Sequence, residues 1–200
     1  MNFKKFLAIP SIYSKFRRFV GNDQVRQLYA DQHIRAFTGA RVLDIGCGPG
    51  DILRFLPEVD YVGFDISPEY IESARQHFGR RAKFFCEPVG NGINAPADSF
   101  DIAIAHGVLH HLNDDESLAL FKIAHSSLKP GGRLITFDGC FTKNQSFLAK
   151  FFVSQDRGQY VRTQKEYERL ASVHFSNIKV AIRTDLIRIP YTHIVMECNK

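Results

Sequence analysis

The sequence predicts an α/β protein in which a mostly parallel β-sheet carries helices on both faces. Three observations predict this class. Short apolar segments typical of buried strands alternate with helix-like segments between residues 41 and 138. A glycine-rich turn directly follows the first of these strands. Two last strand-like segments have no helix-length segment between them, so we expect them to pair antiparallel at the edge of the sheet.

The composition indicates a single domain, residues 1–200. A chain of 200 residues with 44% hydrophobic content can bury a sizeable core but is too short for a second full domain. No uncharged apolar run approaches the roughly eighteen residues of a membrane span. The N-terminus lacks the apolar region and cleavage site of a secretory signal. We therefore expect a cytoplasmic protein.

Two helices are expected before the first strand. Pro10 stands where the first helix begins, and apolar residues recur at helical spacing until Gly21. Asn22 or Asp23 caps a second helix, which ends at Gly39. Residues 1–40 therefore form a predicted N-terminal helical region.

Strands and helices then alternate in order along the chain. The expected strands are residues 41–45, 61–64, 82–86, 100–105 and 132–138. The expected helices are residues 51–56, a helix capped by Ser67, and residues 114–128. A less regular insertion at 139–162 precedes a capping box, Thr163 to Glu166, that begins another helix. The final strands are expected at 177–183 and 191–198.

The charge and the cysteines exclude some classes of function. Five of the 26 basic residues lie within residues 1–20, which contain no acid, so the remaining 21 balance the 21 acidic residues. A nucleic-acid-binding protein usually spreads its basic residues over a broad face. The four cysteines form no CxxC pair, so we expect reduced packing residues and neither disulfides nor a metal site.

The turn GCGPG, residues 46–50, indicates a ligand site. It follows the strand expected at the centre of the sheet, where glycines let a ligand approach the backbone. Asp65 lies about twenty residues further on, where a carboxylate binds ribose hydroxyls; the alternatives are a simple tight turn and a helix-capping acid. Pro49 lacks an amide for pyrophosphate, and Asp44 is a better neighbour for an ammonium or a sulfonium. Those are the charges of S-adenosylmethionine.

Four stretches resemble one known family, the class I S-adenosylmethionine-dependent methyltransferases of the small-molecule, type 11-like group. The stretches are VLDIGCGPG, YVGFDIS, SFDIAIAHGVLHHL and LKPGGRLI. The resemblance implies a Rossmann-like, doubly wound sheet of seven strands with an antiparallel last strand. It also implies the cofactor contacts: Asp44, Gly46, Cys47 and Gly48 at the methionine part, Asp65 at the ribose, Ile66 at the adenine ring and Glu87 at its amino group. The family more often has a Gly-Asp pair where this chain has Cys86-Glu87, so the register at Glu87 can differ by one residue.

Three histidines are candidates for a catalytic base. The donor methyl is already activated, so catalysis is chiefly positioning, and a base is needed only for a weakly acidic acceptor. His106, His110 and His111 follow the fourth strand beside the expected methyl position. The alternative is a structural or cofactor-side role, because the family resemblance includes a histidine-leucine pair here; His106 is therefore also a cofactor-binding candidate. The turn lacks the Asn/Asp-Pro-Pro-Tyr/Phe pattern of enzymes that methylate nucleobases.

The acceptor site is expected from segments outside the cofactor core. The candidates at or within the 139–162 insertion are Asp138, Arg157, Tyr160 and Arg162. The arginines either clamp a carboxylate or phosphate or pair with local acids such as Asp156. The N-terminal helix either folds over the pocket as a lid, with Tyr13 or Phe16 near the methyl, or packs as an ordinary helix. Residues 1–20 also fit an interfacial membrane contact.

The sequence therefore predicts methyl transfer from S-adenosylmethionine to a small-molecule acceptor at a hydroxyl or carboxyl oxygen. Nucleic acid is not an expected partner. The alternatives are N- or C-methylation, a lipid-like acceptor at a membrane surface, and a noncatalytic protein that binds the cofactor.

Overall fold

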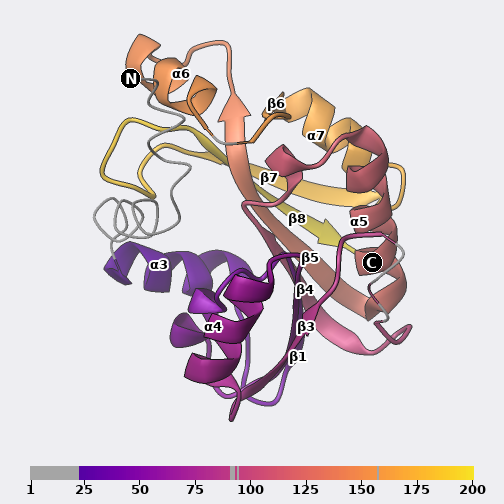
Figure 1. Cartoon of the computed structure of the whole chain (residues 1–200). Coiled ribbons are helices and arrows are strands. Elements are labelled where there is room, and N and C mark those ends of the chain that lie inside the picture. Colours follow the sequence, from indigo (N-terminus) through magenta and orange to yellow (C-terminus); the bar gives the residue numbers. More distant parts are fainter. Residues whose placement is uncertain (1–22, 91–92, 94, 157) are drawn as a thin grey trace.

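The computed structural model describes residues 23–90, 93, 95–156 and 158–200, and its centre is a twisted sheet (Figure 1). The main sheet has the strand order β3-β2-β1-β4-β5-β8-β7. Its strands are β1 (Arg41–Ile45), β2 (Asp60–Asp65), β3 (Ala82–Cys86), β4 (Phe100–His106), β5 (Leu128–Phe141), β7 (Asn177–Arg183) and β8 (His193–Asn199). A two-residue strand, β6 (Arg162–Thr163), pairs with the end of β5. The predicted Rossmann-like α/β sheet of seven strands is confirmed.

Strand directions also match the prediction. β1 to β5 are parallel to one another, and the last two strands, β7 and β8, pair antiparallel with each other at the edge of the sheet. Within this pair the inner strand is β8, which is also antiparallel to β5. Its residues are nearly all buried, whereas those of β7 are mostly half-buried or exposed. The more apolar strand therefore takes the inner position.

Helices precede or connect the strands. They are α3 (Asp23–Tyr29), which continues as a π-helical turn η1 (Ala30–Ile34), the 3-10 turns η2 (Asp51–Phe55) and η3 (Leu109–His111), α4 (Pro68–Phe78), α5 (Asp114–Ser127), α6 (Phe147–Ser154) and α7 (Gln164–Ala171). Ser67 caps α4 by accepting from the Tyr70 amide, as expected. The capping box of Thr163 and Glu166 at α7 is also confirmed.

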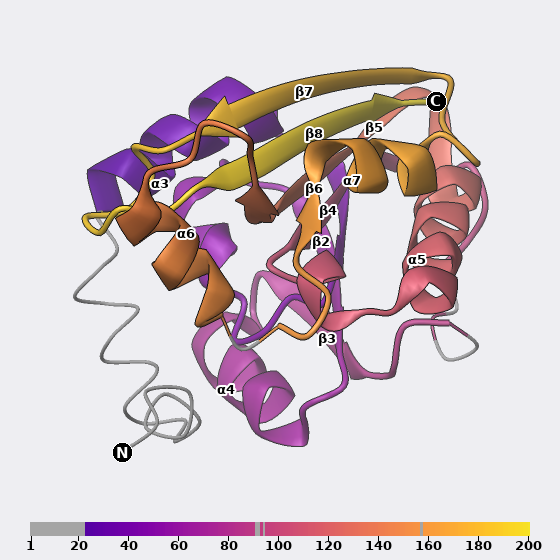
Figure 2. The ribbon, with the colours of Figure 1, turned by 90° about the horizontal axis from the view of Figure 1, so that it is seen from above.

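The helices cover both faces of the sheet. α3 and α4 pack on one face through residues such as Tyr29, Ile71 and Phe78, and α5 and α7 pack on the other through Phe121 and Tyr167. Figure 2, which views the molecule from above, shows these two layers on opposite sides of the strands. No helix within the described residues is both long and apolar enough to span a membrane.

Three predicted elements differ from the structure. The helix expected at 51–56 is only a 3-10 turn, because Pro57 favours the extended backbone that Leu56 adopts. The helix expected to reach Gly39 ends at Ile34, where Arg35 takes a left-handed conformation (φ 50°). The insertion at 139–162 contains a regular helix, α6, whose N-cap is Ser146. The helix and lid predicted within residues 1–22 lie outside the described residues.

Candidate functional site

Most of the predicted site residues that the structure describes gather at the C-terminal edge of the parallel strands. The strand order reverses between β1 and β4, which is the position where ligands bind in doubly wound sheets. Asp44 lies at the end of β1, Asp65 ends β2, and His106 ends β4. Glu87 directly follows β3, and its amide donates to the Asp65 carbonyl at 3.0 Å. One edge of the sheet therefore carries the predicted ligand contacts.

Two glycines of the glycine-rich turn, Gly46 and Gly48, are needed for different reasons. Gly46 and Cys47 donate their amides to the Phe64 carbonyl at 2.7 and 2.9 Å, which fixes the turn against β2. Gly46 has a positive φ of 78°, and a Cβ there would collide with the Val108 side chain. Gly48 also has a positive φ (55°), but a Cβ on Gly48 would meet no atom within 4 Å. Gly46 is therefore needed for internal packing, whereas Gly48 faces open space at the predicted ligand floor.

Asp65 holds the turn in place in this structure. One carboxylate oxygen accepts from the Gly48 amide and the other from the Ser67 amide, both at 2.8 Å. A carboxylate oxygen has two lone pairs, so each oxygen retains one for a ribose hydroxyl. Asp65 thus connects the glycine-rich turn to the start of α4, and ribose binding at this position stays a prediction.

Asp44 is a buried carboxylate with one unsatisfied oxygen. Its side chain is 2% exposed, and the Tyr61 hydroxyl donates to Oδ2. Oδ1 has no hydrogen-bond partner among the described residues. Burial raises the pKa of Asp44 to about 7, although the Tyr61 hydrogen bond opposes this shift. A buried acceptor without a partner is costly unless a ligand supplies the donor.

The edge of the sheet suits S-adenosylmethionine at three positions. Asp44 Oδ1 is available for an ammonium group, and Glu87 Oε2 is a second buried acceptor without a partner in the described part of the chain. Between them, the Ile66 side chain is 71% exposed, as an apolar surface for a nucleobase would be. The residues present therefore fit the cofactor that the sequence predicts. Cys47 is buried beside Gly63, so its backbone is the part available to a ligand.

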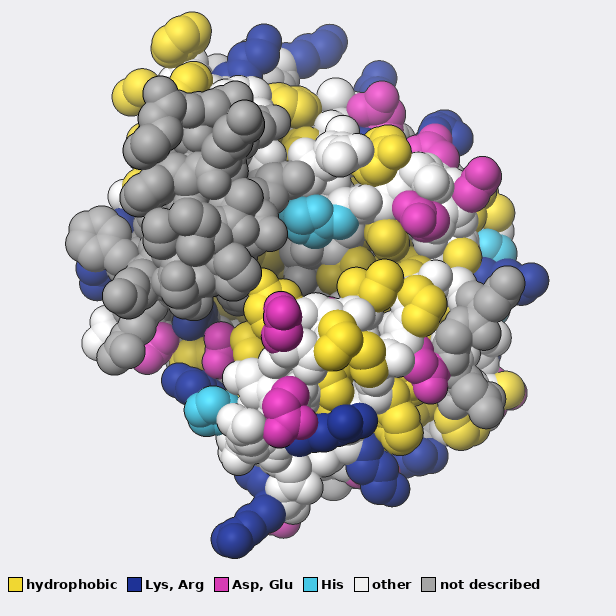
Figure 3. Space-filling view, viewed as in Figure 1, with side chains coloured by type: hydrophobic (Ala, Val, Ile, Leu, Met, Phe, Trp, Pro, Cys, Tyr) yellow, Lys and Arg dark blue, Asp and Glu magenta, His cyan; other side chains and the backbone are white. Residues whose placement is uncertain are grey.

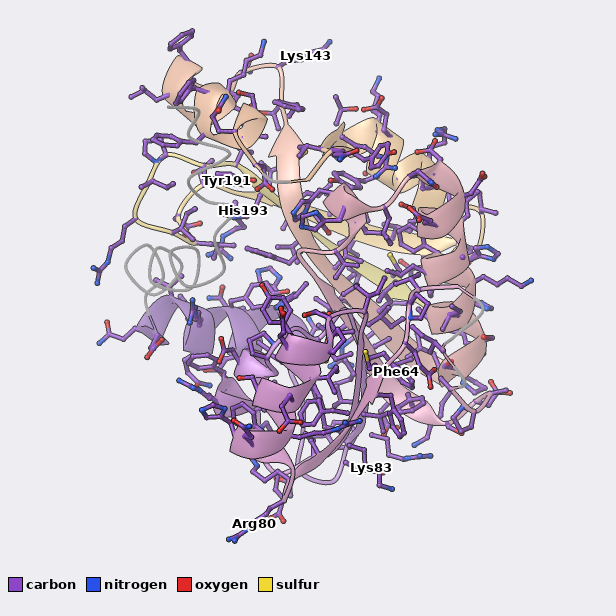
Figure 4. The ribbon with its side chains drawn as sticks, viewed as in Figure 1. Phe64, Arg80, Lys83, Lys143, Tyr191 and His193 are labelled. Atoms are coloured by element: carbon purple, nitrogen blue, oxygen red, sulfur yellow. The ribbon has the colours of Figure 1, made fainter. Side chains whose placement is uncertain are left out.

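His110 is the centre of a buried hydrogen-bond cluster. Its Nδ1 lies 2.8 Å from Asp138 Oδ1, and its Nε2 lies 3.2 Å from Asp156 Oδ1. The Tyr191 hydroxyl donates to the other Asp156 oxygen at 2.5 Å. Figure 4 labels Tyr191 beside the upper part of β5. Burial disfavours a charged imidazole, but the two carboxylates outweigh it and raise the pKa of His110 to about 10. Both ring nitrogens are thus engaged.

The carboxyl partners of His110 respond differently to burial. Burial raises the pKa of Asp138, and His110 only partly offsets this. For Asp156 the interactions with His110 outweigh burial and lower the pKa. Asp138 Oδ2 has no partner among the described residues. A Cβ on Gly158 would collide with the His110 ring, so a glycine there permits the close approach.

His106 and His111 lie in different surroundings. His106 Nε2 is 2.5 Å from the Tyr29 hydroxyl, and its ring packs against Tyr29 and Phe137. Burial raises the pKa of Tyr29 well above its ordinary value, so the phenol remains protonated. His111 is exposed, and its ring centroid lies 4.2 Å from that of His110.

Arg162 departs from its predicted role. The guanidinium donates to Asp114 from Nε and one terminal nitrogen, and to the carbonyls of Leu109, Leu112 and Tyr160. These bonds use all five N–H groups, so none is left for a substrate anion. The open alternative, pairing with an acid, is what the structure contains, but the acid is Asp114, 48 positions away, and not a local one such as Asp156. Arg162 thereby fixes the turn that carries His110 and His111.

The remaining predicted acceptor residues are only partly described. The Tyr160 side chain is 40% exposed, and its amide donates to the His110 carbonyl at 2.9 Å. Arg157, Tyr13 and Phe16 lie outside the described residues. No group of three or more possible metal ligands occurs in the described ranges.

Four site residues were not singled out from the sequence. Tyr29 contacts His106, Tyr61 contacts Asp44, and Tyr191 and His193 lie beside Asp156 and Phe137 (Figure 4). Tyr61 had a signal, since it lies in the strand that ends at Asp65. Tyr29 and Tyr191 are far from the motifs in sequence, and only the folded chain brings them to this edge.

Comparisons with known proteins agree with this geometry. Residues 42–132 match a family described as a methyltransferase domain. The chain is 27% identical over 139 residues to a ubiquinone biosynthesis O-methyltransferase of Idiomarina loihiensis, covering 65% of this chain and 56% of that protein. It is 28% identical over 153 residues to a phosphoethanolamine N-methyltransferase of Triticum aestivum, covering 74% and 30% respectively. The chain therefore spans little more than half, or less, of these curated relatives.

A solved structure supports the fold. Haemonchus contortus phosphoethanolamine N-methyltransferase 2, in complex with phosphomonomethylethanolamine and S-adenosylhomocysteine, has a TM-score of 0.68 and 23% identity, covering 92% of this chain and 47% of that one. The matched domain begins within β1 and includes the glycine-rich turn, Asp65, Glu87 and the histidines after β4. The matched domain, the sheet topology and the fit to the cofactor support a class I S-adenosylmethionine-dependent methyltransferase.

Proposed function

We propose that the protein transfers a methyl group from S-adenosylmethionine to an oxygen, hydroxyl or carboxyl, of a small-molecule acceptor. The observation that carries the cofactor assignment is the pair of buried, unpartnered acceptors at the ends of β1 and β3, Asp44 Oδ1 and Glu87 Oε2, within the described part of the chain. A protein of this family has a reason to keep such acceptors unsatisfied, because the ammonium and the adenine amino group of the cofactor supply the missing donors.

In this proposal, different residues bind different parts of the cofactor. Asp44 and the backbone of residues 46–48 hold the methionine part, Asp65 holds the ribose, and Ile66 and Glu87 hold the adenine. The bound cofactor supplies an activated methyl group. The chain itself has to position the acceptor in line with that methyl and exclude water, which is where proximity contributes most.

His106 is the base that the geometry favours. His110 is held between two carboxylates, and its pKa of about 10 leaves it protonated near neutral pH. His106 is instead paired with a phenol, Tyr29, whose hydroxyl can donate to Nε2 or accept from it. The pair therefore tolerates both protonation states of the imidazole, as a group that removes a proton must. The Idiomarina loihiensis relative, an O-methyltransferase by name, supports an oxygen acceptor.

The test combines an acceptor screen with one variant. Purified protein and methyl-labelled S-adenosylmethionine are incubated with phenols, carboxylic acids and amines, and label transfer is measured. We expect transfer to an oxygen acceptor, with His106→Phe lowering kcat by about 10²–10⁴-fold while the Kd for the cofactor stays within about twofold. His125→Phe is the matched control, because His125 lies in the last turn of α5 and packs against Phe175, away from the proposed site. Loss of cofactor affinity together with turnover in His106→Phe would indicate the cofactor-side role instead.

N-methylation is the second candidate, and the Triticum aestivum relative favours it. A neutral amine attacks through its own nitrogen lone pair and loses a proton only after the methyl has been transferred, so it depends less on a base. Transfer to amines alone, with His106→Phe retaining its rate, would select this candidate. Cofactor binding without transfer to any acceptor class would select a noncatalytic binding protein.

A further inference from the structure

Helix α6 presents an apolar outer face to solvent. Phe147 is 84% exposed, Leu148 57% and Phe151 46%, whereas Ala149 and Val153 on the inner side are buried. The helix is well formed, since the Ser146 side chain accepts from the Ala149 amide. Single exposed apolar residues are ordinary, but three large ones within two turns of one helix form a patch. Figure 1 shows α6 projecting from the top of the molecule, and Figure 3 shows hydrophobic side chains at that corner.

The charge around this patch has one sign. Residues 142–155 contain two lysines, Lys143 and Lys150, and no aspartate or glutamate. Both lysines are exposed. Lys143 lies at the outer tip of the segment in Figure 4. Lys150 follows Phe147 by three positions and precedes Phe151, so it flanks the apolar face. The patch therefore combines large apolar side chains with two exposed lysines and with no acidic residue in the same segment, 142–155.

We propose that α6 is an anchor that docks the protein on an anionic lipid surface. Phe147, Leu148 and Phe151 would enter the boundary between headgroups and acyl chains, while Lys143 and Lys150 contact anionic headgroups. A lipid surface is the partner that this chemistry fits, because α6 projects from the molecule and carries exposed apolar side chains beside two lysines. This inference is independent of the acceptor atom, since it concerns where the protein sits rather than what it methylates.

The position of α6 gives such an anchor a consequence for the site. The helix follows β5, which carries Asp138, and leads directly into Asp156, which contacts His110. A membrane bound at α6 would therefore lie next to the histidine cluster. Residues 1–20, the membrane contact predicted from the sequence, are a separate segment, so the two anchors can be distinguished by substitution.

The experiment is flotation of the full chain with phosphatidylcholine vesicles that contain phosphatidylserine, and with pure phosphatidylcholine vesicles. We expect binding only to the first. Phe147→Ser combined with Phe151→Ser lowers the partition coefficient by on the order of tenfold or more, and Lys143→Gln with Lys150→Gln lowers it by several-fold. Val173→Ser is the matched control, because Val173 is 60% exposed in the turn after α7. It should bind like the unchanged protein.

Several outcomes would overturn the proposal. One is equal binding to both kinds of vesicle in the unchanged protein. Another is unchanged binding in the Phe147 and Phe151 variant together with loss of binding when Lys4 and Lys5 are replaced by Gln, which would place the contact in residues 1–20. A third is absence of vesicle binding with self-association that the Phe147 and Phe151 variant abolishes. Cofactor affinity measured on each variant shows that the fold is retained.

Discussion

At the scale of single residues, Asp44 links cofactor binding to pH. Its pKa is raised to about 7 by burial, so below pH 7 the carboxyl is mostly neutral and attracts an ammonium only weakly. We expect the affinity for S-adenosylmethionine to fall as the pH drops below 7, by at most about tenfold per pH unit, and to level off above it. Calorimetric titration across this range measures the profile.

Asp44→Asn is the control for that profile. The amide keeps the size of the side chain and an oxygen for the Tyr61 hydroxyl, but it carries no charge at any pH. Affinity should be low and independent of pH. A variant that retained the slope would show that another group titrates.

His110 is a second residue whose charge has a measurable effect, in this case on stability. The folded pKa is about 10 and the ordinary value is 6.5, so the folded state binds this proton more tightly than the unfolded chain does. The stabilisation is therefore complete below pH 6.5 and is lost as the pH rises through 10. Urea unfolding at about pH 6, where Asp156 is ionised, should show His110→Gln less stable by about 3–5 kcal/mol, because the carboxylate loses its cation. A difference that stayed constant up to about pH 10 would contradict the paired imidazolium.

At the scale of elements, Arg162 joins three segments that the chain order separates. It connects β6 to the turn η3 and to the start of α5 through four hydrogen bonds. A fifth goes to the Tyr160 carbonyl in its own segment. Lysine cannot reproduce this planar set of donors, so Arg162→Lys should lower the free energy of unfolding by about 2–4 kcal/mol and disorder the histidine turn. Arg169→Lys is the matched control: it also pairs with Asp114 but is 63% exposed, and should cost less than about 1 kcal/mol. Equal effects of the two substitutions would refute this role for Arg162.

The helices and strands also show how much of the fold can be predicted from local sequence patterns. The strand positions, their directions and the caps at Ser67 and Thr163 follow from local patterns, because hydrophobic period and side-chain capping act over a few residues. The two contacts His106 has with Tyr29 and Phe137 involve residues 77 and 31 positions away, and no local pattern encodes them. The helix α6 could not be predicted from its period, because it lacks a polar face.

The distinction between local patterns and contacts that only folding creates also applies to the candidate functional site. The proposed cofactor contacts Asp44, Gly48 and Asp65 lie in short motifs, which is why the amino-acid sequence alone could predict them. The partner of Arg162 could not be predicted, because Asp114 lies 48 positions away and no local pattern encodes the contact. Asp156 instead contacts His110, which explains why a predicted candidate base is held as a cation.

At the scale of the whole molecule, we propose that one half of the sheet binds the cofactor and that the other half supplies the acceptor side. The methyltransferase match ends at Gly132, near the start of β5, so it covers the strands that carry the proposed cofactor contacts. The segments beyond it supply Asp138, Asp156, α6 and Tyr191, which we propose to lie on the acceptor side. Relatives with different acceptors can therefore share the first half, and the acceptor has to be determined from the second half.

This division predicts a directional response to ligands. At about 100 times its Kd, S-adenosylmethionine should raise the free energy of unfolding by about 2.7 kcal/mol, and NAD should not. Hydrogen exchange should slow at residues 46–48 and at the Ser67 amide, which adjoin the cofactor, while the outer strand β7 exchanges as before. Asp65→Ala should abolish both effects, because it removes the acceptor that holds the Gly48 and Ser67 amides. Protection spread equally over β7 would contradict the division between the two halves of the sheet. Equal stabilisation by NAD would mean that the glycine-rich turn recognises the nucleotide part alone and that Asp44 contributes no selectivity for the ammonium.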